Sequence, residues 1–230
     1  MCFRRMDVMM DEPEGKARLK QIQDEHGSPD PFAGGLNRGD DENVAKFTGC
    51  TATVILMNST HIYCANAGDS RTVLARSSGA QMCFPLSDDH KPDNAEEKAR
   101  IEAAGGFVEE NRVNGSLNLS RSLGDFEYKS TDAPYTQQMV TCDPEIRTVQ
   151  RQAIDQFIIL ACDGIWDCLT SEECVIQTRD ALTALTDTQP VSTLIEEMFD
   201  RIIAKDILSS QGVGTDNMTC IVVQLKRTPM

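Results

Sequence analysis

The chain has 230 residues, of which 40% are hydrophobic, so it is long enough to form one large domain or two small ones around an apolar core. It carries 22 basic and 36 acidic residues for a net charge of −14, and such a surface repels nucleic acid, whose phosphates require patches of lysine and arginine. No stretch approaches the ~18 apolar residues of a membrane span. We therefore expect neither a nucleic-acid partner nor a membrane partner.

The nine cysteines are odd in number, and no Cys-x-x-Cys pair occurs among them. Several lie in apolar runs, as buried thiols do. This usage disfavours a zinc site and favours a reducing compartment, so we expect a cytoplasmic or nuclear location. The first eleven residues lack the apolar stretch that is typical of a signal peptide.

The first half of the chain changes from a helical pattern to a strand pattern. Residues 3–22 keep a helical period that breaks near Pro13. Residues 24–46 are polar and rich in Gly, Pro and Asp, which predicts a loop or insert. Short β-branched and apolar runs then predict a meander of antiparallel strands over 51–57, 61–65 and 72–75.

The second half combines helices with two strongly apolar strands. The spacing predicts a helix from about Asn94 to Ala104, ended by two glycines, and the polar residues 126–141 predict an exposed flap. The remaining predicted elements are a buried strand (157–162), a helix capped by Ser171, a helix (191–208) and a final strand (218–225). Because strands and helices are segregated rather than alternating, we predict an α+β fold with antiparallel sheets.

Two aspartates stand at the margins of two strongly apolar strands. Asp163 follows the run 157–160 and precedes a glycine, and Asp216 precedes the run 220–223. An isolated Asp after a strand is most often a turn former or a helix cap. Two of them at the margins of buried strands are typical of a site for a hard divalent cation, whose preferred ligands are oxygens.

Two further aspartates belong to the same hypothesis. Asp167 lies four residues after Asp163, so both side chains face the same way if the turn is helical. Asp69 lies in a Gly-Asp-Ser turn, where a local turn-forming role is the simpler interpretation.

We expect no catalytic role for the three histidines. We expect His26 to be solvated, His61 to be structural and His90 to orient the start of the predicted helix. The sequence contains no Gly-x-Ser-x-Gly elbow and no Gly-x-x-x-x-Gly-Lys loop, so no motif supports covalent catalysis or a nucleotide-binding loop.

Seven short motifs, in order, resemble those of the metal-dependent protein serine/threonine phosphatases of type 2C, the PPM family. The resemblance covers about residues 45–225, and its specificity comes from the number and order of the motifs. They are Gly49-Cys50-Thr51-Ala52, Asn66-Ala67-Gly68-Asp69-Ser70-Arg71, Asp89-His90-Lys91-Pro92, Arg112-Val113-Asn114-Gly115-Ser116-Leu117, Ser120-Arg121-Ser122-Leu123-Gly124-Asp125, Cys162-Asp163-Gly164-Ile165-Trp166-Asp167 and Asp216-Asn217-Met218-Thr219.

The resemblance implies a fold, a reaction and a cofactor. The implied fold is a sandwich of two antiparallel sheets flanked by helices, in α-β-β-α layers. The implied reaction is hydrolysis of phosphoserine and phosphothreonine in phosphoprotein substrates by metal-activated water, with two or more Mg²⁺ or Mn²⁺ ions. Carried over by position, Asp163 and Asp216 would bind the core metal pair, and Asp69, Asp163 and Asp167 would frame a further metal position. It assigns no role to Asn114, Gly115 or Arg121.

The family pattern also contains an Arg, a Glu-Asp pair and Asp-Gly-His-Gly-Gly before its first helix, whereas this chain starts at that helix. We therefore expect one PPM-type domain over 1–230 that is incomplete at its amino terminus, with feeble or no turnover and a tendency to self-associate. The alternative is a catalytically inactive phosphatase-like module that binds phosphoproteins or a regulatory partner. A calcium-binding role ranks far lower, because the acidic cluster 40–42 lacks the spacing of a calcium loop.

Overall fold

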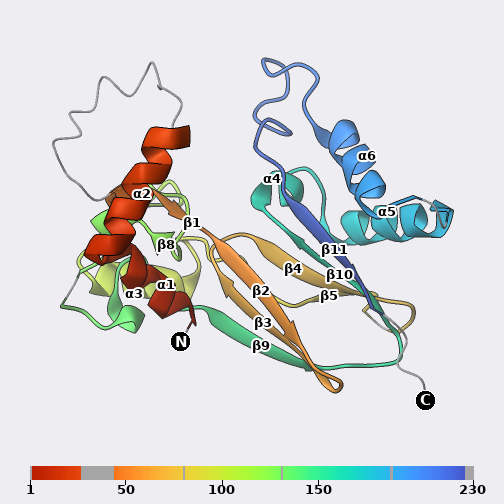
Figure 1. The fold of residues 1–230 in the computed structure, drawn as a ribbon, viewed down its shortest axis with the longest axis horizontal. Coiled ribbons are helices and arrows are strands. Elements are labelled where there is room, and N and C mark those ends of the chain that lie inside the picture. The colour runs from red at the N-terminus through yellow and green to blue at the C-terminus, as the bar shows by residue number, and fades with distance from the viewer. Residues whose placement is uncertain (1, 27–43, 80, 131, 187–188, 226–230) are drawn as a thin grey trace. The chain divides into compact units, whose positions relative to one another are not determined.

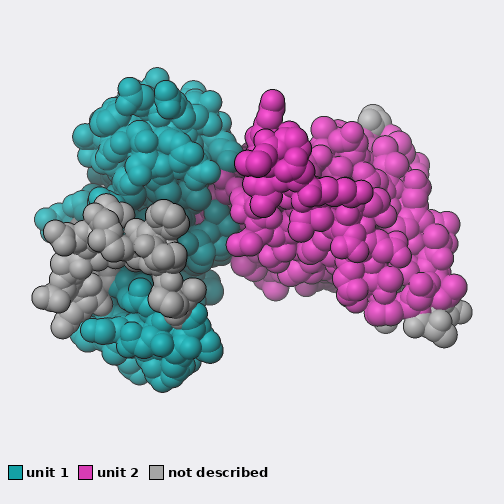
Figure 2. Space-filling view, turned by 90° about the horizontal axis from the view of Figure 1, so that it is seen from above, with its two compact units in different colours: residues 1–52, 90–144 teal, residues 53–89, 145–230 magenta. Residues whose placement is uncertain are grey.

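The computed structural model describes residues 2–26, 44–79, 81–130, 132–186 and 189–225 and separates the chain into two compact units, which Figure 2 distinguishes by colour. Unit 1 comprises residues 1–52 and 90–144, and unit 2 comprises residues 53–89 and 145–230. Each unit is therefore assembled from two stretches that are distant in sequence. The prediction of a single domain over 1–230 stays a prediction.

Unit 2 contains two sheets, and only Ala52, the first residue of β2, is assigned to unit 1. The four-stranded sheet has the order β11–β10–β4–β5 and is antiparallel throughout, and the three-stranded sheet has the order β2–β3–β9, with β9 antiparallel to β3. The strands are β2 (Ala52–Met57), β3 (His61–Ala67), β4 (Arg71–Arg76), β5 (Cys83–Pro85), β9 (Glu145–Gln150), β10 (Asp155–Ala161) and β11 (Cys220–Gln224).

One face of the four-stranded sheet packs against helices. Val73 and Ala75 of β4 and Phe157 and Ile159 of β10 share an apolar cluster with buried residues of α5 and α6. Figure 1 shows both helices on the same side of this sheet. The helices of unit 2 are α4 (Asp163–Trp166), α5 (Ser171–Ala184) and α6 (Ser192–Ile202).

The opposite face of that sheet packs against the three-stranded sheet. Leu74 and Ile158, which alternate with the helix-facing residues, join Ile62 and Cys64 of β3 in a second buried cluster. Alternation along β4 and β10 thus places one set of side chains under the helices and the other between the sheets. The predicted α+β sandwich of antiparallel sheets is confirmed.

The outward face of the three-stranded sheet carries exposed apolar side chains. Val54, Leu56 and Ile146 are 48%, 67% and 60% exposed. They alternate with Ile55, Met57 and Val149, which pack toward the core. This face is consistent with the expected tendency to self-associate, which stays a prediction.

Unit 1 is mainly helical and irregular. One of its buried clusters combines Ile101 of α3 with Val113 and Val140. The elements are α1 (Cys2–Asp11), α2 (Pro13–His26), η2 (Val44–Lys46), β1 (Gly49–Cys50), α3 (Ala95–Ala103), β6 (Val108–Glu109), β7 (Arg112–Val113), β8 (Leu123–Gly124), η3 (Phe126–Tyr128) and η4 (Tyr135–Gln137).

The polar segment predicted over 24–46 falls mostly outside the described residues. Its first three residues belong to the end of α2 and its last three form η2, whereas 27–43 lie outside the described part. The flap predicted over 126–141 is only partly exposed, because Gln138, Val140 and Thr141 are buried. Val140 is buried because it packs into the cluster with Ile101 and Val113.

Three local predictions were wrong. The predicted meander breaks after β3, since β4 pairs with β10 and β5 in the other sheet. The cap of α5 is Thr170 rather than Ser171: its hydroxyl accepts from Glu173 N at 3.2 Å, and Glu173 accepts in return from Thr170 N at 2.9 Å. The helix predicted over 191–208 ends at Ile202, because Ala204 N bonds to the carbonyl of Gly214 at 2.8 Å.

No helix in the described ranges has both the length and the apolar character needed to cross a bilayer.

Candidate functional site

The three aspartate-bearing segments meet at one edge of the four-stranded sheet. Ala161, the last residue of β10, pairs with Cys220 at the start of β11 and with Arg71 at the start of β4. Asp163 lies two residues after Ala161, and Asp69 lies two residues before Arg71. Because antiparallel neighbours begin where the central strand ends, the residues just outside these strands collect at the same edge.

A glycine allows the segments of Asp163 and Asp216 to approach closely. A Cβ atom added to Gly164 would lie 2.3 Å from Asn217 O and 3.6 Å from the Cβ of Asp216. A distance of 2.3 Å is far inside van der Waals contact, so a side chain at position 164 cannot coexist with this loop position. The structure therefore places Asp216 beside the residue that follows Asp163.

Asp163 and Asp167 are the two ends of one helical turn. Cys162 is extended, with φ −78° and ψ 171°, and Asp163 begins α4 directly after it. Asp167 closes the turn, and its N–H donates to the carbonyl oxygen of Asp163 at 2.8 Å. The i, i+4 relation predicted from the sequence is therefore present in the backbone.

Asp69 is buried, with 3% of its surface exposed, in the turn between β3 and β4. The turn requires Gly68, whose φ is 112°. Asn66 holds it by donating to the carbonyls of Gly68 at 3.0 Å and Asp88 at 3.1 Å. Asp69 thus occupies a fixed position that its own turn determines.

A cationic side chain, Arg71, and an aromatic side chain, Trp166, lie together next to this edge. Arg71 donates to both carboxylate oxygens of Asp89, at 2.9 Å and 2.8 Å, and its guanidinium lies 5.2 Å from the centroid of the Trp166 ring. Hydrogen bonding to Asp89 raises the pKa of Arg71 against the opposing effect of burial, and the charges of Asp89 and Asp167 add to the increase. Trp166 in turn donates from Nε1 to the carbonyl of Ala161 at 2.8 Å.

The donor set of this edge fits a hydrated cation better than a closed protein cage. Within the described residues, no group of three or more His, Cys, Asp or Glu side chains is arranged to hold a metal ion. The feature that remains is the approach of the Asp216 loop to Gly164, which brings together two chain segments that each carry one carboxylate. Mg²⁺ is typically bound through one or two carboxylates while it keeps several waters, so two carboxylates match this coordination.

The three histidines are distributed over both units. In unit 1, His90 is buried and its carbonyl accepts from Ser120 N at 3.1 Å, whereas the side chain of His26 is 77% exposed. In unit 2, His61 Nδ1 contacts Thr60 Oγ1 at 2.9 Å. The exposure of His26 agrees with the solvated state expected for it, whereas the roles expected for His61 and His90 stay predictions.

Sequence reasoning missed the buried ion cluster around Glu97 in unit 1. Glu97 is 3% exposed; Arg121 contacts its Oε1 at 2.6 Å, and Arg100 and Ser120 contact its Oε2 at 2.9 Å and 2.5 Å. Burial alone would raise the pKa of Glu97, but hydrogen bonds from Arg121 and Arg100 outweigh it and lower that pKa to about 2. The only sequence signal was a carboxylate in the first turn of a helix, which the helix dipole already explains.

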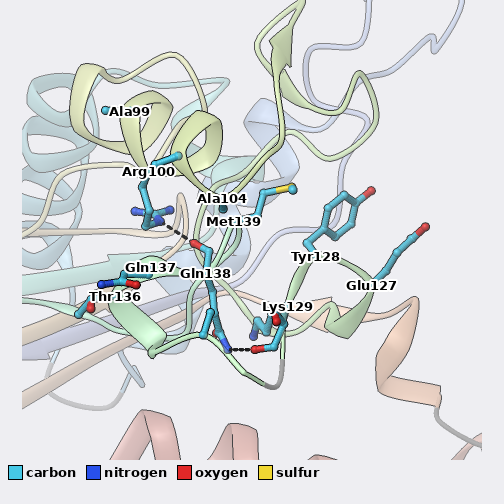
Figure 3. Close-up of a pocket in the computed structure, with 13 residues that line it drawn as sticks. Ala99, Arg100, Ala104, Glu127, Tyr128, Lys129, Thr136, Gln137, Gln138 and Met139 are labelled. Atoms are coloured by element: carbon cyan, nitrogen blue, oxygen red, sulfur yellow. Dashed lines mark hydrogen bonds between the residues drawn. The ribbon is translucent and has the colours of Figure 1, made fainter.

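Unit 1 also contains a cavity of about 780 Å³ between α3 and residues 127–139 (Figure 3). Across it, Arg100 Nε donates to the carbonyl of Gln138 at 3.1 Å, and Gln138 Nε2 donates to the carbonyl of Ser130 at 3.1 Å. None of the four predicted aspartates lines this cavity.

The sequence is similar to that of known protein phosphatases along most of the chain. Residues 13–207 match the family described as Protein phosphatase 2C. "Probable protein phosphatase 2C 21" of Arabidopsis thaliana is 41% identical over 246 residues, covering 98% of this chain and 67% of the relative. "Protein phosphatase 2C homolog 2" of Schizosaccharomyces pombe is 50% identical over 181 residues, covering 77% of this chain and 47% of the relative.

Solved structures show the same similarity. A phosphatase from Toxoplasma gondii superposes with a TM-score of 0.61 at 28% identity, covering 73% of this chain and 49% of that one. A sex-determining protein of C. elegans superposes with a TM-score of 0.62 at 27% identity, covering 77% of this chain and 40% of that one. The chain therefore spans about half or less of these two structures.

Proposed function

The chain belongs to the protein phosphatase 2C family, and from this we propose that it carries the metal-binding edge of a protein serine/threonine phosphatase. The proposed reaction is hydrolysis of phosphoserine and phosphothreonine in phosphoproteins. The observation that carries the proposal is the approach of the Asp216 loop to Gly164, next to Asp163.

In this proposal Asp163 and Asp216 hold Mg²⁺ or Mn²⁺, and Asp69 and Asp167 frame a further position at the same edge. Bound ions of this kind lower the pKa of water and neutralise phosphate oxygens during in-line attack. The protein's part is to hold two carboxylates at fixed positions, because preorganised ligands do not have to be ordered when the substrate arrives. None of the motifs assigns a general acid.

Two features of this edge support a preorganised site. Gly164 is buried and lies against the Asp216 loop, so the loop has little freedom to move toward it. The single turn from Asp163 to Asp167 is fixed by the hydrogen bond from Asp167 N to Asp163 O. Both features restrict the backbone on either side of the proposed ligands.

The alternative function is a catalytically inactive module that binds phosphoproteins through the same edge. It is favoured by one observation, namely that no three-member group of metal-ligating side chains is present among the described residues. Both functions require Asp163 and Asp216 to bind the cation, and they differ in whether a phosphopeptide is hydrolysed.

The test combines Mn²⁺ titration calorimetry with hydrolysis of a phosphothreonine peptide by the purified 230-residue chain. We expect Asp163→Asn to weaken Mn²⁺ binding at least ~10-fold and to abolish any Mn²⁺-dependent hydrolysis. Asp180→Asn, which makes the same charge change at an exposed position of α5, is the matched control. Phosphopeptide binding without hydrolysis would favour the inactive module, and Mn²⁺ binding that Asp163→Asn leaves unchanged would overturn both functions.

A further inference from the structure

The loop that carries Asp216 is not held by the sheet ladder. The pairing of β10 with β11 ends at Ala161 and Cys220, so residues 216–219 lie beyond the last paired residue. Asp216 itself is exposed, and its Oδ1 accepts from the N–H of Asn217 at 2.7 Å. Other contacts must therefore fix the loop relative to Asp163.

Cys162 supplies such contacts. Its thiol donates to the carbonyl of Asn217 at 3.3 Å and accepts from Thr219 N at 3.2 Å, and its own N–H donates to the carbonyl of Thr219 at 3.1 Å. The side chain thus continues the link between the two segments past the point where the backbone ladder stops.

Asn217 O is held between two neighbours of Asp163. The Cys162 thiol contacts this oxygen directly, and Gly164 leaves the space that the oxygen occupies, since a Cβ there would lie 2.3 Å from it. Asp163 lies between these two residues in sequence, and Asp216 directly precedes Asn217. Displacement of Asn217 therefore changes the position of Asp216 relative to Asp163.

We propose that Cys162 is a positioning residue, whose thiol fixes the Asp216 loop against the backbone of Asp163 and so sets the spacing of the two carboxylates. The proposal rests on the proposed function of this edge. A thiol can both donate and accept a hydrogen bond, which is what the carbonyl of Asn217 and the N–H of Thr219 require. A serine hydroxyl offers the same two functions, whereas an alanine offers neither.

The experiment measures Mn²⁺ affinity by titration calorimetry and thermal unfolding for three variants of the whole chain. Cys162→Ala is expected to weaken Mn²⁺ binding by ~10-fold, the usual effect of removing a group that orients a metal ligand. Cys162→Ser is expected to restore the affinity to within about threefold of wild type, because it keeps a donor and an acceptor.

Cys174→Ala is the matched control, because Cys174 is a fully buried thiol of α5 in the apolar core of the same unit. It is expected to lower the melting temperature without changing Mn²⁺ affinity. A merely structural role for Cys162 would give the same pattern as this control, with lower stability and unchanged affinity.

The outcomes separate this inference from the function on which it rests. If Asp163→Asn weakens Mn²⁺ binding but Cys162→Ala does not, the positioning role is wrong and the metal site stands. The role is also wrong if Cys162→Ser binds Mn²⁺ as weakly as Cys162→Ala. If Asp163→Asn leaves Mn²⁺ binding unchanged, the proposed function itself fails.

Discussion

Two acidic side chains of this molecule differ in burial and in hydrogen bonding. Glu97 in unit 1 is 3% exposed and accepts hydrogen bonds from Arg121, Arg100 and Ser120. Asp216 in unit 2 is exposed, beside a loop that Cys162 and Gly164 hold in place. The hydrogen-bonding capacity of the Glu97 carboxylate is therefore used by side chains of the same unit. Around Asp216, by contrast, the contacts fix the backbone of the loop, and the carboxylate remains exposed to solvent.

This contrast separates acidic residues that stabilise a fold from those suited to bind a ligand. A buried carboxylate with two arginine partners contributes to folding only while all partners remain, because removal of one leaves an uncompensated charge. An exposed carboxylate that is not paired with a buried cation contributes little to folding, and its solvent-facing side can bind a metal ion. The following changes test this difference.

The largest effect is expected from Glu97→Gln. The substitution leaves Arg100 and Arg121 buried without their counter-charge, so we expect a loss of ~3–5 kcal/mol in the free energy of unfolding. Urea unfolding of the variant measures this loss. Glu96→Gln, at the exposed neighbouring position of α3, is the control and is expected to change stability by less than ~0.5 kcal/mol. Similar losses in both variants would remove the distinction.

The pH dependence of stability is expected to follow Glu97. Its pKa is lowered from 4.5 to about 2, so its ion pairs contribute their full stability above the unfolded pKa. That contribution is lost as the pH falls from about 4.5 toward 2, and the shift corresponds to ~3 kcal/mol. Urea unfolding at several pH values measures the decline. Glu97→Gln should decline less over this range, and an equal decline would assign the acid sensitivity to other carboxylates.

The smallest effect on stability is expected from Asp216→Asn. The side chain is exposed, so we expect the free energy of unfolding to change by less than ~0.5 kcal/mol. Mn²⁺ affinity, measured by calorimetry, should nevertheless fall by at least ~10-fold. A loss of stability comparable to that of Glu97→Gln would show that Asp216 is itself a structural residue.

The parts of the fold that the sequence predicted are those with a strong local signal. The apolar run 157–160 predicted the central strand β10, and the break near Pro13 predicted the boundary between α1 and α2. By contrast, β9 (Glu145–Gln150) was missed because its two apolar residues, Ile146 and Val149, are three positions apart and do not follow the period of a strand, and it depends on pairing with β3, some eighty residues earlier. Contacts of this range are not encoded in any short window.

The sequence predicted the candidate metal ligands but not the neighbouring residues that hold them in position. Asp163 and Asp216 stood out because each borders an apolar strand. The roles of Cys162 and Gly164 became visible only when the register of β10 and β11 placed residue 217 beside them. Glu97 was missed for the same reason, since its partner Arg121 lies 24 residues away. The partners of a buried charge are set by the folded structure, so no short stretch of sequence reveals them.

Trp166 is the only tryptophan of the chain, and it is buried in α4 between Asp163 and Asp167. Its indole nitrogen donates to the carbonyl of Ala161, so the ring is fixed at the end of β10. Intrinsic fluorescence excited at the indole band therefore reports on unit 2 alone. The chain thus carries a built-in optical probe beside the proposed cation site, with which emission changes during metal titration can be followed without any label.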